Sequence, residues 1–186
     1  VYTTGGYATY LAASGFTDNY YYGSRRFQRA PITLLGQNGK PHAPFTFRHL
    51  NSNCNTEIGT TNTIGTISAF PRGPFGVSQC DAVHNAGEIW SSALWEVRNR
   101  MVARLGHGPG TTRVLQAVTD GMKLAPLGPT FLQERDAIIA AAGAMSASPE
   151  ASADVLDVRE GFRFRGMGFS ASIQSSPSRV SVAGSL

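Results

Sequence analysis

The composition of the chain changes sharply near residue 82, and this change limits the fold more than any other feature. Residues 1–81 are rich in Gly, Asn, Thr, Pro and aromatic side chains, with no helical period beyond about residues 6 to 13. From Val83 onward, apolar residues recur with the spacing of helices. We therefore expect a mainly α fold with long irregular loops in the first half.

The first predicted helix follows Val83 and has one apolar face. That face is formed by Ile89, Ala93, Val97, Met101 and Leu105. Charged residues between them, such as Glu96, are expected on the polar side. Residues 106–110 contain three glycines and a proline, which should end the helix.

Three shorter helices are expected after this break. Thr111 or Thr112 is predicted to cap the second, whose expected apolar set is Val114, Leu115, Val118 and Met122. Thr130 and Gln133 have the spacing of a capping box and should begin the third, which runs to about residue 142. A polar linker at 146–152 should precede a last short helix at 155–164. Residues 1–169 then form one lobe, and residues 170–186 form an extended tail.

The charge of the chain is mildly positive, with 16 basic and 12 acidic side chains. The arginines are scattered and do not form a recognition helix or a stacking pattern, so we expect no nucleic-acid partner. There is no apolar run of about 18 residues and no leader pattern, so we expect no membrane partner. Because the chain begins at Val1, we expect a processed or excised polypeptide.

Cys54 and Cys80 lie in polar surroundings rich in Gly, Asn and Thr. Exported proteins place disulfides in such segments, so a bond between these two cysteines is our main expectation. Two free thiols or a pair of zinc ligands are the alternatives. The low lysine content fits the same secreted, extracellular location.

His84 and Glu88 are separated by four residues where a loop enters the first predicted helix. On a helix this spacing places both side chains on one side, so they could bind zinc together. His84 could instead be a catalytic residue that donates a hydrogen bond to a developing oxyanion, with a carboxylate such as Asp81 positioning it. A histidine that only caps the helix or packs in the core is the third interpretation.

Glu88 lies one turn into an otherwise apolar helix, beside Trp90. Burial of its carboxylate would cost on the order of several kcal/mol unless a cation pairs with it. Arg25, Arg26 or Arg135 is the expected structural partner.

Several ordered blocks of the sequence resemble the C-terminal half of fungalysin-type zinc metallopeptidases. These are GGYAT at 5–9, YGSRRF at 22–27, VHNAGEIW at 83–90, ALWEV at 93–97, DGMKLAP at 120–126, PTF at 129–131 and RDAI at 135–138. The resemblance implies a thermolysin-like peptidase with two lobes, of which this chain is the helix-rich C-terminal one.

The resemblance also implies roles for single residues. His84 matches the histidine that stabilises the tetrahedral intermediate, and Arg25 matches an arginine that holds a substrate carbonyl. Asp81 and Glu88 are expected to support the site. The H-E-x-x-H motif and the glutamate that bind zinc in this family are not in the chain, so we expect no metal ligand here and zinc held by residues outside it.

The predicted function is therefore that of the C-terminal half of a secreted zinc endopeptidase. A separate N-terminal chain or segment would supply the zinc site, and proteins or peptides would be the substrates. The alternative is a non-catalytic binding subunit that keeps the fold and the groove. A third interpretation, a stand-alone zinc hydrolase, would need Asp81 as a ligand beside His84 and Glu88.

Overall fold

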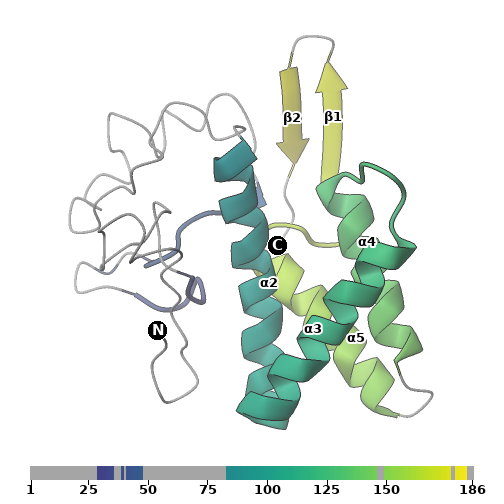
Figure 1. The fold of residues 1–186 in the computed structure, drawn as a ribbon. Coiled ribbons are helices and arrows are strands. Elements are labelled where there is room, and N and C mark those ends of the chain that lie inside the picture. Colours follow the sequence, from purple (N-terminus) through teal and green to yellow (C-terminus); the bar gives the residue numbers. More distant parts are fainter. Residues whose placement is uncertain are drawn as a thin grey trace.

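The computed structural model describes residues 29–35, 39, 41–47, 83–145, 149–176 and 179–183. Within this part of the chain, four helices form a ring in which each packs against two others (Figure 1). The helices are α2 (Val83–Leu105), α3 (His107–Leu124), α4 (Phe131–Ala144) and α5 (Pro149–Phe164). Helix α2 contacts α3 and α5, and α4 contacts the same two helices. The predicted mainly α fold is confirmed.

Helix α2 buries most of the face that its apolar period predicts. Ile89, Ala93, Val97 and Met101 are fully buried, and the last three belong to the main core cluster. The prediction for Glu96 is wrong, because its side chain is buried as well. Its burial is compensated by a cation that lies far away in the sequence, Arg165.

Helix α3 begins earlier than predicted, at His107. Only Gly106 interrupts the helical path, with φ of 85°, a conformation that glycine adopts without steric strain. Gly110 lies inside α3 because its missing side chain lets the helix approach α2: a Cβ there would lie 2.7 Å from the backbone of Met101. The glycines of residues 106–110 therefore allow a tight corner and a close contact, and they do not form a long break.

The buried face of α3 also differs from the predicted one. Val114 is buried, but Leu115 and Met122 are 61% and 60% exposed. The inward positions are instead occupied by small residues, Gly110, Ala117 and Gly121. A Cβ on Gly121 would lie 2.5 Å from Ile138 of α4. Close backbone approach thus decides which face of α3 points inward.

Helix α4 begins at the predicted capping box. Gln133 donates its backbone N–H to the Thr130 hydroxyl, and Thr130 donates its own to the Gln133 side chain. Helix α5 begins six residues before the predicted start, inside the expected polar linker. Its first residue, Pro149, has a fixed φ that suits the first helical position. Val158 and Phe162 of α5 complete the core.

The tail after the helices forms an antiparallel hairpin of β1 (Ser172–Ser176) and β2 (Arg179–Ala183). Its register pairs Ile173 with Val182. In Figure 1 the hairpin projects beyond one end of the helices. Helix α5 ends at Phe164 and β1 begins at Ser172, so the predicted boundary near residue 170, which stays a prediction, lies between these two elements. In the described part of the chain, no helix is long and apolar enough to cross a membrane.

Gly110→Ala should lower the free energy of unfolding by about 1–3 kcal/mol, because the new methyl group would overlap the backbone of Met101. Gly108→Ala is the matched control in the same helix, since a Cβ there meets no atom within 4 Å. It should leave stability unchanged or raise it by up to about 1 kcal/mol. Urea unfolding of both variants measures the difference, and equal stabilities would contradict the close approach of α2 and α3.

Candidate active site

The structure places His84 in the first turn of α2, as the second residue of that helix. Glu88 follows one turn later and is described together with its side chain. The side chain of His84 lies outside the described part of the structure, as do the predicted site residues Arg25 and Asp81. The two cysteines of the predicted disulfide, Cys54 and Cys80, lie outside it too. The described part of the site therefore consists of Glu88 and the residues around it.

Glu88 is almost fully buried, and its carboxylate lies 3.9 Å from the guanidinium of Arg29. Arg29 is also buried. Two of the arginines predicted as partners, Arg25 and Arg26, lie outside the described residues, and the third, Arg135, is engaged elsewhere. The sequence offered no signal for Arg29 beyond its place in the basic stretch that begins at Arg25.

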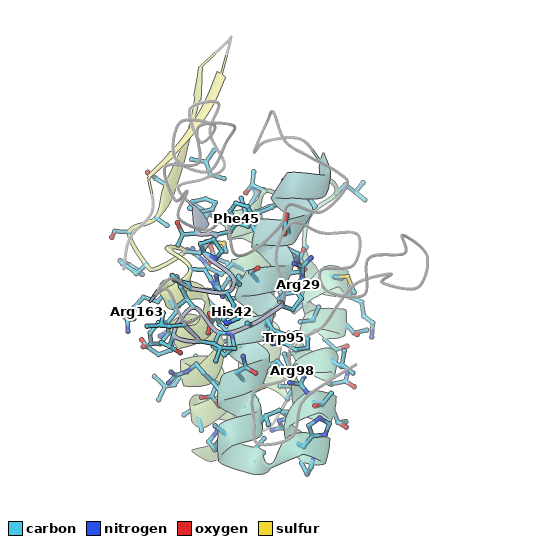
Figure 2. All side chains as sticks on the ribbon, turned by 90° about the vertical axis from the view of Figure 1, so that its left-hand side faces the viewer. Arg29, His42, Phe45, Trp95, Arg98 and Arg163 are labelled. Carbon is cyan, nitrogen blue, oxygen red and sulfur yellow. The ribbon has the colours of Figure 1, made fainter. Side chains whose placement is uncertain are left out.

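Arg29 begins a segment, called the segment 29–47, whose described residues are 29–35, 39 and 41–47. These residues lie along α2 on the side away from α3 and α4 (Figure 1). Figure 2 views the molecule from this side and shows Arg29, His42 and Phe45 in front of the helices. Phe45 and Phe47 are fully buried, and the Phe47 ring stacks on that of Phe131 at 6.4 Å between centroids. The segment therefore lies beside α2 and also contributes to the hydrophobic core.

A buried arginine that the sequence analysis did not identify, Arg165, holds this segment in place. Its side chain is 0% exposed. Nη1 donates to the carbonyl oxygens of Ala43 and Phe45 at 2.6 and 2.9 Å, and Nη2 donates to that of Ala30 at 2.7 Å. The backbone carbonyl of Arg165 in turn accepts from the N–H of Phe47 at 2.7 Å. Arg165, the first residue after α5, thus binds both ends of the segment.

Glu96 neutralises Arg165 and contacts the same segment. Its Oε1 lies 2.7 Å from Nη2 of Arg165 and accepts the backbone N–H of Ile32 at 2.6 Å. Burial lowers the pKa of Arg165, and the attraction of Glu96 opposes that change. The guanidinium keeps its charge, because arginine does not lose its proton in proteins. Glu88 and Glu96 are two turns apart, so α2 is attached to the segment at two levels.

A second group of charges lies farther along α2, away from His84. Asp154 of α5 is fully buried between Arg104 and Arg113, and Asp157 accepts from Arg104 at 2.8 Å. These residues join α2, α3 and α5. Each carboxylate faces arginines, which is the arrangement of a structural ion-pair cluster and leaves no group positioned for acid–base chemistry.

The described residues do not fit a zinc site. They include no group of three or more His, Cys, Asp and Glu side chains that could hold a metal ion. The candidate pair of His84 and Glu88 is also unfavourable, because the carboxylate of Glu88 is buried and faces the cation of Arg29.

Comparison with known proteins gives one consistent result. The family model described as Fungalysin metallopeptidase (M36) matches residues 63–171, a range that contains His84 but not Arg25. An extracellular metalloproteinase of Pyrenophora tritici-repentis is 32% identical over 106 residues, which cover 50% of this chain and 16% of that protein. One of Leptosphaeria maculans is 33% identical over 109 residues, which cover 51% of this chain and 16% of that protein.

A probable extracellular metalloproteinase 5 of Arthroderma benhamiae is 39% identical over a shorter stretch of 70 residues, 31% of this chain and 11% of that protein. The matched part of this chain therefore spans about a sixth or less of the length of these curated relatives.

Glu88→Ala should lower the free energy of unfolding by about 3 kcal/mol or more, because it removes a carboxylate from the buried guanidinium of Arg29. Glu160→Ala is the control, since Glu160 pairs with Arg163 within α5 and both side chains are partly exposed. Exposed pairs contribute little, so this variant should stay close to wild type. Chemical unfolding compares the two, and an equally small effect at Glu88 would show that its buried pair is not needed for folding.

Proposed function

The chain belongs to the fungalysin metallopeptidase family, and we propose that it is the C-terminal, substrate-facing part of a secreted zinc endopeptidase. The observation that carries the proposal is the family match over residues 63–171, which includes the V-H-N-A-G-E-I-W block at the start of α2. The relatives are named as extracellular metalloproteinases, which supports hydrolysis of peptide bonds outside the cell.

In this proposal His84 stabilises the oxyanion that forms when a peptide carbonyl is attacked. A donor of this kind works when it is held in place before the reaction, because reorientation during the reaction would cost energy. The helix that carries His84 meets this requirement. Its next turn is attached through Glu88 to Arg29, and a later turn is attached through Glu96 to Arg165. The first turn of α2 also has backbone N–H groups without a partner inside the helix and a positive potential, both of which favour negative charge.

Arg25 is proposed to bind a carbonyl oxygen of the substrate, as the family resemblance implies. In the sequence it lies four residues before Arg29, whose guanidinium faces Glu88. Arginine suits this role because its guanidinium offers several donors in a fixed plane. Asp81, three residues before His84, is proposed to support the histidine.

The zinc ion of the proposed peptidase is held by residues outside this chain. The described residues provide no ligand cluster, and the chain has no H-E-x-x-H motif. When bound, the metal would supply an activated water molecule and polarise the substrate carbonyl. In this proposal the chain contributes His84, which donates a hydrogen bond to the developing oxyanion, and Arg25, which binds the substrate. Its required partner is the N-terminal zinc-binding chain or segment of the same peptidase.

His84→Ala in the complete peptidase should lower kcat by about 100- to 1,000-fold, as for the loss of one oxyanion donor. His107→Ala is the matched control, because His107 begins α3, beyond the other end of α2, and contacts Arg98 at 3.1 Å. Its kcat should equal that of wild type. Steady-state hydrolysis of a chromogenic peptide measures both variants. A folded His84→Ala variant with wild-type kcat would rule out the proposed role, and a zinc-loaded wild-type protein without hydrolysis would favour a binding subunit.

A further inference from the structure

A pocket with a volume of about 640 Å³ lies between α4 and α5, beside the turn that follows α5. The two helices pack against each other (Figure 1). All three parts line the pocket: Ile139 comes from α4, Arg159 and Arg163 from α5, and Met167 and Phe169 from the turn. Its volume is in the range of about 300–1,000 Å³ that is usual for ligand sites. We call it the α4–α5 pocket.

Phe169 provides an aromatic ring at this pocket that no other part of the chain covers. Its side chain is fully exposed. Ile139 and Met167 add further apolar surface to the lining. Aromatic side chains are enriched where proteins bind their partners, so the ring of Phe169 is suited to contact a ligand.

The turn that carries Phe169 is fixed from two sides. The N–H of Met167 donates to the carbonyl oxygen of Phe162 at 2.9 Å, which attaches the turn to the end of α5. From α4, the guanidinium of Arg135 donates to the carbonyl oxygens of Met167 and Gly168 at 3.1 and 2.8 Å. Phe169 therefore projects from a backbone that is already ordered, and such a group loses less conformational freedom when a ligand binds.

The charges around the pocket leave one arginine unpaired. Arg163 pairs with Glu160 at 2.8 Å, and Arg135 pairs with Asp136 at 2.7 Å. Arg159 is exposed, and it forms no ion pair or hydrogen bond with the residues that the structure describes. Three arginines and two carboxylates line the pocket, so it carries one excess positive charge, which belongs to Arg159.

This combination favours a ligand that has a single carboxylate next to an apolar group. The guanidinium of Arg159 can hold a carboxylate through two parallel hydrogen bonds. Phe169 and Ile139 can contact an aliphatic or aromatic group beside it. A doubly charged phosphate would be neutralised less well, because only one arginine of the pocket is unpaired. A polypeptide with an aspartate or glutamate beside an apolar residue has both required groups.

The pocket lies at the end of the helices where α2 begins. Helices α2 and α5 are antiparallel: Trp90 contacts Phe162 with ring centroids 5.4 Å apart, whereas Arg104, near the end of α2, pairs with Asp157. Trp90 also contacts Phe131, the first residue of α4, at 5.1 Å. The pocket residues of α4 and α5 lie within about two turns of these two phenylalanines. A polypeptide bound there would therefore lie at the same end as the first turn of α2.

We propose that the α4–α5 pocket is a docking site for an acidic segment of a protein substrate, one that contains an aspartate or glutamate next to an apolar residue. Arg159 binds the carboxylate, and Phe169 contacts the apolar side chain. The source of the segment rests on the proposed function, because it takes the protein as a peptidase. Binding of the segment does not depend on catalysis and can be measured by itself.

Fluorescence anisotropy with a labelled hexapeptide of alternating glutamate and leucine tests the binding. The complete protein is used, with a zinc chelator present so that the probe is not cleaved. Arg159→Ala should raise the Kd about tenfold or more, as for the loss of a hydrogen bond to a charged group. Phe169→Ala should raise it about tenfold, as for the loss of an aromatic anchor. Both side chains are exposed, so both variants should fold like the wild-type protein.

Two variants outside the pocket are the matched controls. Lys123→Ala also removes one exposed positive charge, and Leu127→Ala also removes a fully exposed apolar side chain. Neither residue lines the pocket, so both variants should keep the wild-type Kd. An equal loss of affinity in these controls, or an unchanged Kd in Arg159→Ala, would overturn the proposal.

Arg159→Glu distinguishes attraction of charge from a general effect of the substitution. This variant should lose the acidic probe and should bind a hexapeptide of alternating lysine and leucine more tightly than the wild-type protein does. Weaker binding of both probes would contradict the role of Arg159. A molecular mass that falls from dimer to monomer in Phe169→Ala would show a second copy of the chain in the pocket and would also overturn the proposal.

Hydrolysis of two quenched fluorescent peptides tests the source of the segment. Both have the same cleavable core, and one also carries the acidic probe sequence on a glycine–serine linker. With the zinc-loaded wild-type protein, KM should be about five- to tenfold lower for the extended peptide, and Arg159→Ala should abolish this difference without changing kcat. Equal KM values in the wild-type protein would overturn the proposal. If neither peptide is hydrolysed, the proposed function fails, whereas Arg159-dependent binding of the probe still supports the pocket as a site.

Discussion

The buried guanidinium of Arg165 joins the segment 29–47 to the helices. A guanidinium that is fully removed from water needs partners for its donors. The two terminal nitrogens of this one find them in three backbone carbonyl groups and one carboxylate, whereas its Nε has no hydrogen-bond partner among the described residues. Those partners lie between 69 and 135 residues away in the sequence. The irregular segment 29–47 and the helices thereby become one unit, because neither can move without exposing unpaired buried groups.

Helix α2 connects this unit to the proposed chemistry. One of its faces contributes Ile89, Ala93, Val97 and Met101 to the interior, so the helix cannot rotate or slide easily. The first turn of α2, which contains His84, precedes these buried residues in the same helix. Glu88 forms the link between the two, since it lies in the next turn and faces Arg29 of the segment. A reaction site needs this kind of rigidity, because misplacement by about 1 Å can cost a hundredfold in rate.

The sequence predicts those features whose physical cause is local. The apolar period of α2 and the capping box of Thr130 and Gln133 depend on residues within a few positions of one another, and both are confirmed. The face of α3 could not be predicted in this way. Hydrophobicity favours Leu115 as a core residue, but Gly110 and Gly121 allow neighbouring backbones to approach and so decide the orientation.

The polar contacts of the site could not be predicted from the sequence either. Glu88 was expected to need an arginine, and the structure places Arg29 beside it, a residue that no sequence spacing singles out. Arg165 lies in a short run of alternating arginine and phenylalanine that gives no sign of burial. Spacing alone left three interpretations of His84 open, and only the family resemblance favours one of them. The roles of His84 and Arg25 stay predictions.

In the proposed function His84 acts on the substrate, while residues outside this chain hold the zinc ion. The zinc content of the complete peptidase with His84→Ala, measured by mass spectrometry on dialysed protein, distinguishes this role from that of a metal ligand. If His84 acts on the substrate, the zinc content of the variant equals that of the wild-type protein. Loss of zinc from the variant would show that His84 is a metal ligand.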